Sequence, residues 1–283
     1  MQAAATAAAT ANNATLTVLA ADNDPQKQYA QLQTVISSGQ YDGIIVQPIL
    51  STGLTTLVNQ AIAQKMKVVT MDQILGPDLT TSEIQVKGLS GSVVFNPSVL
   101  GTKFGKLVVS ACASKNLDPC NVGYMYDLKA SSLDVAIHDS FMKAIAGSPV
   151  KIVGEGEDFY TPSKGLSATQ NLLQANPNIN LIAASDQGIE GAVQAVSSAG
   201  KAGKVLLVGY GGSVAGIDGV KAGTWFGTIA QLPATEGKGA VNALVKAIRT
   251  STVTPGSDPS ANAPDGGVIT STNVSKFTGE WPG

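Results

Sequence analysis

The sequence PQKQYAQLQTVISSGQYDGIIV, residues 25–46, is the most informative segment for the architecture of this chain. Its pattern returns as PSKGLSATQNLLQANPNINLIA, residues 162–183, with proline, lysine, glutamine and apolar positions in the same register. The register continues through KVV at 67–69 and KVL at 204–206. A repeated unit of this length is far larger than a solenoid repeat. It predicts two similar lobes, which would enclose a cleft for a ligand.

Each copy has the pattern of a helix followed by a buried strand. In the first copy the proline stands at a helix start, Leu32 and Ile36 lie on the apolar face, and Gly39 ends the helix. The continuous apolar run at 44–46 is typical of a parallel strand covered on both faces. Alternation of such units predicts a doubly wound α/β fold, which binds ligands at the carboxyl edge of its sheet.

The rest of the chain continues this alternation. An Ala-rich stretch at 1–13 is predicted to be helical and lacks the features of an intact signal peptide. A Pro, Ser, Gly and Asp-rich loop is expected at 251–267. Further strands are predicted at 15–20, 68–71, 122–126, 151–155, 224–230 and 268–270, and further helices at 54–62, 99–113, 133–146 and 234–248.

Composition limits the function classes. The 283 residues suffice for two α/β domains, and 43% hydrophobic content suffices for their cores. A net charge of −2 with scattered lysines argues against nucleic-acid binding. No apolar run reaches the roughly 18 residues of a membrane span. No metal site is expected, because the loop 22–24 lacks the glycine and final glutamate of a calcium loop. No nucleotide phosphate loop is expected either, because GYGG at 209–212 lacks its spacing.

The two cysteines, Cys112 and Cys120, allow two interpretations. In one continuous helix they would lie about 12 Å apart, too far for a disulfide. The sequence Asn-Leu-Asp-Pro at 116–119 would end the helix and fold Cys120 back. A disulfide is therefore the preferred prediction, and two buried free thiols are the alternative.

Several segments resemble a known family. They are NDPQKQYAQLQTVISSGQYDGIIVQP (23–48), KVVTMDQ (67–73), NPSVLGTKFGKLV (96–108), the stretch 162–201, VLLVGYGGS (205–213) and GTIAQLP (227–233). In this order they resemble the periplasmic sugar-binding proteins of ABC transporters, of the ribose-binding type. The resemblance implies two Rossmann-like lobes, 1–96 plus 232–260 and 97–231 plus 261–283. Three crossing segments would join them, with hinges near Asn96, Gln231 and Pro264.

The resemblance also implies a ligand site. Amides and carboxylates hold the hydroxyl groups of a sugar, and aromatic rings stack on its C–H faces. Phe159 or Tyr160 matches the aromatic position. The full set of expected ligand contacts is Gln47, Asp72, Gln73, Asn96, Ser98, Tyr160, Ser185, Asp186 and Gln231.

Some of these residues have an alternative role. Asp72 could be an ordinary helix cap beyond a strand, and Asp186 could cap a helix beginning near Gln187. Gln231 could serve the hinge alone. Of the other candidates, His138 is expected to be structural and Trp225 to pack in the core rather than to stack on a sugar.

Departures from the family pattern predict a ligand other than ribose. The residue after the site aspartate is usually Arg and is Gln73 here. A second Arg would fall at Ile137, and a strand-end Asp falls at Gly211. The resemblance also implies that the family's first strand is missing from lobe one, because the chain would enter partway through the family's first helix.

The expected function is therefore that of a solute-binding component of an ABC importer. Its partners would be a small sugar or polyol and a membrane permease, with no cofactor. Export to the periplasm or cell exterior is expected, although the chain carries no signal peptide. A monomer is expected unless another chain supplies the missing strand.

Two rival functions have less support. The effector-binding core of a LacI-type repressor shares the fold, but the chain has no DNA-binding helix-turn-helix and no basic face. A sugar-processing enzyme would need two placed carboxylates, and Asp72 with Asp186 is the only candidate pair. The single histidine leaves little room for a Ser-His-Asp triad, so no enzymatic activity is expected.

Overall fold

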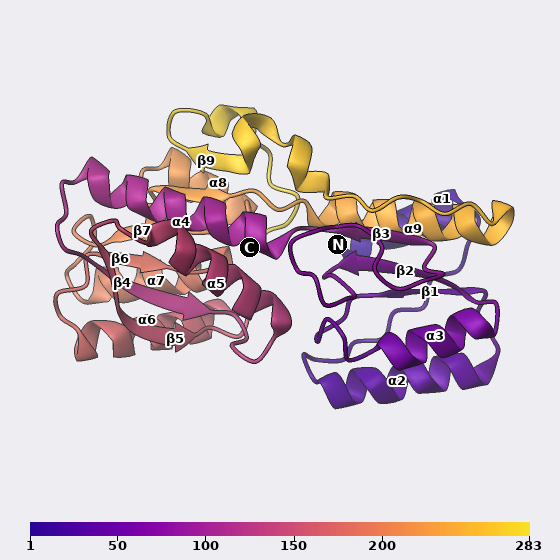
Figure 1. Cartoon of the computed structure of the whole chain (residues 1–283). Coiled ribbons are helices and arrows are strands. Elements are labelled where there is room, and N and C mark those ends of the chain that lie inside the picture. Colours follow the sequence, from indigo (N-terminus) through magenta and orange to yellow (C-terminus); the bar gives the residue numbers. More distant parts are fainter. The chain divides into compact units, whose positions relative to one another are not determined.

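The computed structural model describes residues 1–283, which form two compact units (Figure 1). Each unit is a parallel or mostly parallel sheet covered by helices, as the α/β pattern predicts. The first unit, called lobe one below, comprises 1–96, 131–133 and 233–259. The second, lobe two, comprises 97–130, 134–232 and 260–283.

Lobe one contains a three-stranded parallel sheet in the order β1-β2-β3. Its middle strand carries Val68 and Val69, which are fully buried because helices cover both faces. Helices α2 and α3 pack on one face and α9 on the other, with α1 against α9. The elements are α1 (Gln2–Ala11), α2 (Pro25–Ser38), β1 (Gly43–Val46), α3 (Thr55–Ala63), β2 (Lys67–Asp72), β3 (Gly91–Val94) and α9 (Pro233–Thr250).

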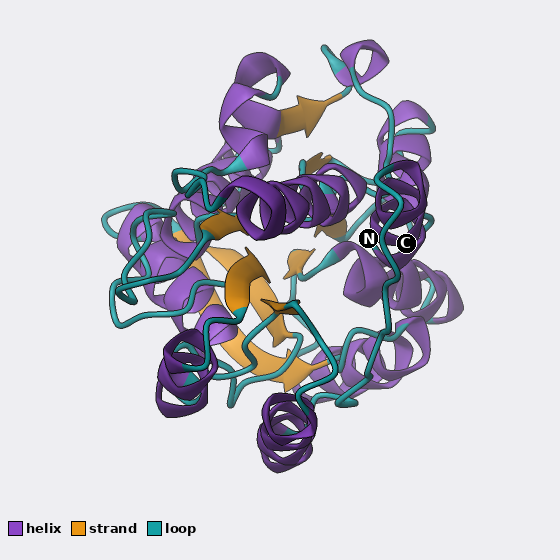
Figure 2. Cartoon of the chain, turned by 90° about the vertical axis from the view of Figure 1, so that its right-hand side faces the viewer, coloured by secondary structure: helices purple, strands orange, loops and turns teal.

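Lobe two contains a six-stranded sheet in the order β5-β4-β6-β7-β8-β9, parallel except for the last strand. Helices pack against the strands of this sheet, and Figure 2 colours the helices and strands of the chain separately. No helix of the chain is both long and apolar enough to cross a membrane. The elements are α4 (Pro97–Ser114), β4 (Cys120–Tyr126), α5 (Ser132–Ile145), β5 (Val150–Glu157), α6 (Pro162–Ala175), β6 (Leu181–Ala183), α7 (Asp186–Ser198), β7 (Leu206–Val208), α8 (Val214–Lys221), β8 (Gly227–Ile229) and β9 (Val268–Thr270), with short 3-10 helices at Pro259–Asn262, Pro264–Gly267 and Val274–Lys276.

Both copies of the sequence repeat fold as predicted. Helices α2 and α6 begin at the matching prolines, and β1 and β6 contain the matching apolar runs. Gly39 ends α2 in the left-handed conformation, with φ 62°, which favours glycine. The predicted N-terminal helix is also confirmed, as α1.

The predicted strand at 15–20 is wrong. This segment belongs to neither sheet, and Val18 and Leu19 are each 51% exposed. The alternating apolar residues of 15–20 suit a strand, yet a strand forms only where a partner strand accepts its hydrogen bonds. The segment has no such partner, because the edge strand β1 pairs with β2 alone. The strand predicted at 224–230 is shorter, Gly227–Ile229. β3 had not been predicted.

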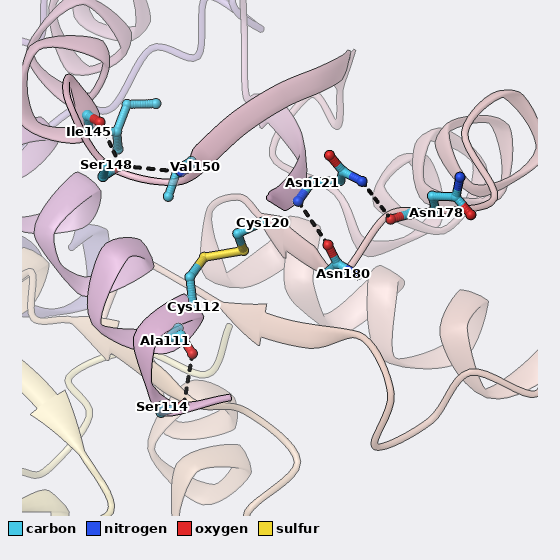
Figure 3. Close-up of a disulfide and its surroundings, with 10 residues drawn as sticks. All are labelled: Ala111, Cys112, Ser114, Cys120, Asn121, Ile145, Ser148, Val150, Asn178 and Asn180. Atoms are coloured by element: carbon cyan, nitrogen blue, oxygen red, sulfur yellow. Dashed lines mark hydrogen bonds between the residues drawn. A yellow bond between two sulfur atoms is a disulfide. The ribbon is translucent and has the colours of Figure 1, made fainter. Parts of the chain in front are cut away.

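Cys112 and Cys120 form a disulfide, as preferred from the sequence (Figure 3). Their Cα atoms lie 5.9 Å apart and both side chains are fully buried. Helix α4 ends at Ser114, and the N–H of Leu117 donates to the carbonyl of Cys112 at 3.1 Å. This turn brings the chain back so that Cys120 begins β4. The bond therefore ties the end of a helix to the start of the neighbouring strand.

Replacing both cysteines by serine is expected to lower the free energy of unfolding by about 2.5 kcal/mol, because the unfolded chain loses a closed loop. Urea denaturation of the wild type and of Cys112→Ser/Cys120→Ser measures this difference. Dithiothreitol should destabilise the wild type and leave the double variant unaffected. Two titratable thiols in the denatured, unreduced wild type would contradict the disulfide.

Candidate ligand-binding site

The carboxyl edge of the lobe-one sheet brings two predicted ligand residues together. Asp72 ends β2, and Gln47 directly follows β1. The strands β1 and β2 pair in parallel. The Nε2 of Gln47 donates to Oδ2 of Asp72 at 2.6 Å. Gln47 is exposed and Asp72 is half-buried. The pair thus presents an amide and a carboxylate at the edge where open α/β sheets bind ligands.

The backbone at Asp72 has an uncommon conformation. Its φ is 64°, in the left-handed region, although it is not glycine. The N–H of Gln73 donates to the carbonyl of Met71 at 2.7 Å, which closes a γ-turn around Asp72. Such a residue costs about 1–3 kcal/mol, and residues of this kind cluster at functional sites. The turn is therefore a structural argument for Asp72 as a ligand residue and against its role as an ordinary helix cap.

A second carboxyl group lies against Asp72. Glu236, in the first turn of α9, makes a side-chain hydrogen bond with Asp72 and is only 1% exposed. Burial raises the pKa of Asp72, while the hydrogen bonds with Glu236 and Gln47 and the charge of the Met1 amino group oppose the rise. Sequence reasoning missed Glu236. An acidic residue in a first helical turn is common for electrostatic reasons and so carries no signal of its own.

Asn96 and Ser98 lie on either side of the first crossing. Asn96, the last residue of the first segment of lobe one, is buried. Its N–H donates to Oδ2 of Asp258 at 3.1 Å, and its Nδ2 donates to the carbonyl of Thr80. Ser98 is in the first turn of α4, and its carbonyl accepts from Oγ1 of Thr102 at 2.8 Å. The ligand roles of Asn96 and Ser98 stay predictions.

The carboxyl edge of the lobe-two sheet carries a buried polar cluster. Asp127 follows β4, Asp158 follows β5, and Ser185 closely follows β6. The hydroxyl of Tyr210 donates to Oδ2 of Asp127 at 2.6 Å, and the hydroxyl of Ser185 donates to Oδ2 of Asp158 at 3.4 Å. None of these side chains is more than 4% exposed. The sequence had indicated only Ser185.

Asp127 and Asp158 form a pair of buried carboxyl groups whose pKa values are both raised. Their side chains are hydrogen-bonded to each other. Burial and the adjacent Asp127 charge raise the pKa of Asp158 to about 10, and burial raises that of Asp127. Two adjacent buried carboxyl groups do not both ionise, because each charge is desolvated and repels the other. With a pKa of about 10, Asp158 carries a proton at neutral pH and can donate it in the hydrogen bond with Asp127.

The acid pair supports the aromatic loop. Phe159 and Tyr160 both have positive φ, 52° and 57°. The N–H of Tyr160 donates to Oδ1 of Asp158 at 3.0 Å, and the N–H of Phe159 to the carbonyl of Asp127 at 2.9 Å. Phe159 is 47% exposed, whereas Tyr160 is half-buried. Phe159 is thus the more accessible ring, and the predicted contact of Tyr160 with ligand stays a prediction.

Asp186 makes its contacts inside lobe two. The Asp186 side chain is fully buried. Its Oδ2 accepts from the N–H of Ser213 at 2.8 Å and from the Ser213 hydroxyl at 2.7 Å. Its Oδ1 accepts from the hydroxyl of Thr228 at 2.6 Å. Burial is the main cause that raises its pKa to about 6. These bonds favour a structural role. The alternative of a capping Asp186 is wrong, because the hydroxyl of Ser185 caps α7 by accepting from the N–H of Gly188.

Glycines in and shortly after the GYGG segment have a steric role. A Cβ on Gly209 would lie 2.4 Å from Oδ1 of Asp186, and one on Gly216 would lie 2.4 Å from its Oδ2. A Cβ on Gly211 would lie 2.8 Å from Cζ2 of Trp281, whose Nε1 donates to the Gly211 carbonyl at 2.9 Å. These positions make room for Asp186 and Trp281.

The remaining candidates lie in lobe two. The N–H of Gln231 donates to the carbonyl of Gly211 at 3.2 Å, just before α9. Trp225 is buried in the apolar core, as predicted. The ring of His138 packs against Tyr124 and Tyr126, with centroids 5.1 and 4.9 Å away. Its Nε2 lies 3.5 Å from a Glu155 carboxylate oxygen, a contact that suits a structural histidine.

Sequence relatives agree with this architecture. The ribose import binding protein of Salmonella typhimurium is 28% identical over 235 residues, covering 83% of this chain and 74% of the relative. The D-allose-binding periplasmic protein of Escherichia coli is 28% identical over 236 residues, with the same two coverages. The named relatives are solute-binding proteins rather than enzymes.

Solved structures share the fold over nearly the whole chain. A solute-binding protein of an ABC transporter from Actinobacillus succinogenes, with bound D-allose, is 26% identical with a TM-score of 0.75, covering 98% of this chain and 93% of that one. The myo-inositol-binding protein of Caulobacter matches with a TM-score of 0.80 at 21% identity, covering 98% and 90%; at this identity the match shows the fold alone.

The family match covers most of the chain. Residues 1–251 match the family described as "Periplasmic binding protein domain". The two α/β lobes, the polar carboxyl edges of their sheets and the relatives all agree with it. The chain therefore belongs to the periplasmic binding protein family, as a ribose-binding-like member with the type I fold.

Proposed function

We propose that this protein is the solute-binding component of an ABC importer and captures a small sugar or polyol. The single observation that carries the proposal is the Gln47–Asp72 pair, held on a γ-turn at the carboxyl edge of the lobe-one sheet. Relatives across the family are named for sugar binding, including ribose, allose and xylose. The rival functions, a regulator core and an enzyme, have no such observation in their favour.

The chemistry of the pair suits a neutral polyhydroxylated ligand. A carboxylate accepts hydrogen bonds from two hydroxyl groups, and such charge-assisted bonds are about twice as strong as neutral ones. The Gln47 amide offers both a donor group and an acceptor. Type I binding proteins take their ligand between two lobes, so residues of lobe two would complete the contacts on closure. Closure is favoured because the ligand contacts both lobes only in the closed state.

The identity of the ligand is constrained by the missing arginines. Gln73 and Ile137 replace the two family positions that are usually basic, and Ile137 is buried in lobe two. Without these two cations, the site would hold its ligand through hydrogen bonds from carboxylate and amide side chains. Such a site does not select for an anionic ligand or for ribose. We therefore propose a neutral aldose or polyol other than ribose, with D-allose, D-xylose, glycerol and myo-inositol as candidates. D-allose is the first probe, because a structural relative above 25% identity holds it.

The partner and location follow from the same proposal. A solute-binding component delivers its ligand to a membrane permease, so the protein would act in the periplasm or at the cell exterior. The buried disulfide supports this location, because such bonds persist in oxidising compartments.

A thermal-shift screen over the candidate sugars tests the function. Ligand at roughly 100 times its Kd stabilises the folded protein by about 2.7 kcal/mol, which is a readily measured rise in Tm. At least one candidate should give a saturable shift. Sucrose at the same concentration controls for stabilisation by excluded solute. Shifts no larger than the sucrose shift for all the candidates would contradict the proposal.

A further inference from the structure

We propose that Glu236 is a positioning residue for the ligand site: its buried carboxyl group shares one proton with Asp72 and holds the Asp72 carboxylate ready to accept ligand hydroxyls. This inference rests on the proposed function, because it assigns Asp72 to the ligand. Glu236 itself is 1% exposed, on the first turn of α9. It therefore acts through Asp72 rather than by touching the ligand.

Three constraints meet at Asp72. The γ-turn closed by Gln73 and Met71 fixes its backbone. The Gln47 amide holds Oδ2 at 2.6 Å, and the Glu236 carboxyl group makes a second side-chain hydrogen bond. These contacts come from the residue after β1, from the end of β2 and from the first turn of α9. A carboxylate held from three elements loses little conformational entropy when a ligand binds, so its position is preorganised.

The hydrogen bond between the two acids requires a proton. Ionised carboxylates only accept hydrogen bonds, so one of the two groups must carry the hydrogen that joins them. The charged groups that act on Asp72 are Glu236 from α9 and the amino group of Met1 next to α1, while β1 contributes the neutral Gln47. The Asp72–Glu236 pair therefore has a single negative charge when the proton is shared.

The shared proton gives ligand binding two pH limits. When the pair loses its proton at high pH, the two carboxylates repel and Asp72 is displaced. When the pair gains a second proton at low pH, Asp72 loses acceptor capacity. Because burial raises the pKa of Asp72, this acid limit lies above that of an ordinary aspartate. Affinity is then highest between the limits.

Isothermal titration with D-allose from about pH 5 to pH 9 tests this role. Glu236→Gln keeps a neutral donor for Asp72, so it should retain near-neutral affinity within about threefold and lose the decline at high pH. Glu236→Leu removes the donor and should weaken binding about tenfold or more. Glu83→Gln, in an exposed loop of lobe one, is the matched control. If Glu236→Gln keeps the wild-type pH profile, or Glu236→Leu binds normally, the positioning role is overturned.

A measurement without ligand separates this inference from the proposed function. Above about pH 5 the unfolded chain ionises both acids, whereas the folded pair keeps one proton, so the pair's contribution to stability falls as pH rises. The Tm of Glu236→Gln minus that of the wild type should therefore increase between about pH 5 and pH 8. A constant difference would overturn the shared proton even if D-allose failed to bind. If D-allose bound normally and the difference in Tm did not change with pH, the proposed function would stand and the role of Glu236 would be overturned.

Discussion

Replacing Asp72 by asparagine is expected to weaken D-allose binding by about a hundredfold or more. The carboxylate is proposed to accept two ligand hydroxyls, and each hydrogen bond to a charged group contributes about 1.5–3 kcal/mol. An amide has one acceptor atom where the carboxylate has two, and its N–H₂ would face the Gln47 amide donor. Isothermal titration at neutral pH measures the loss.

The matched control is Asp42→Asn. Asp42 directly precedes β1, so it lies at the amino end of the strand whose carboxyl end carries Gln47, and it is exposed. The same chemical change at the opposite edge of the sheet should leave affinity unchanged within experimental error. Equal affinity for Asp72→Asn and Asp42→Asn would show that ligand is bound elsewhere.

Replacing Asp158 by asparagine is expected to stabilise the protein increasingly as pH rises. Asp158 has its pKa raised to about 10 in the folded protein, whereas an unfolded aspartate titrates near 4. The folded state thus binds one more proton between these values, and stability falls by up to about 1.4 kcal/mol per pH unit. Burial is the main cause of the raised pKa of Asp158; the charge of Asp127, its hydrogen bond with Asp158 and the charge of Asp134 add to the rise, and the N–H of Tyr160 opposes it. An asparagine supplies a permanent donor to Asp127 and removes this slope.

Urea denaturation at about pH 5 and pH 8 measures this effect. The advantage of Asp158→Asn over the wild type should grow by several kcal/mol between the two values, since about 1.4 kcal/mol accrues per pH unit. Asp218→Asn, an exposed position on α8 paired with Lys221, should show no such growth. The Asp72–Glu236 pair is the same in all these proteins and cancels in the comparison. A pH-independent difference would mean that the two acids of lobe two do not share a proton.

The sequence predicted the parts of the fold that follow from local pattern. Continuous apolar runs such as 44–46 and 181–183 became buried strands because a parallel sheet covered on both faces needs such residues. The segment 15–20 has a comparable local pattern and is not a strand. Strand formation depends on a partner strand in space, and local sequence does not contain that information.

The candidate site was predictable only in part. Gln47 and Asp72 follow adjacent strands, so the rule for parallel sheets places them together, and they are hydrogen-bonded. Asp186 also closely follows a strand, but Ser213 and Thr228 occupy its oxygens. Strand-end position alone does not separate an aspartate that faces a ligand from one that holds loops together.

The acid pairs were beyond sequence reasoning for a related reason. Asp127, Asp158 and Glu236 acquire their chemistry from burial beside another carboxyl group. Their partners lie far away in the chain, and an isolated acidic residue in a sequence is most often solvated. Only the packed structure shows which acids must share a proton.

Native mass spectrometry of the wild-type protein incubated with D-allose and the other candidate sugars decides whether this chain captures a solute at Asp72. We expect one adduct per chain, with the mass of a single small sugar or polyol, which is absent from Asp72→Asn and present in Asp42→Asn. No adduct with any candidate, or an adduct that Asp72→Asn retains in full, would contradict the claim that this protein captures a sugar-like solute at Asp72.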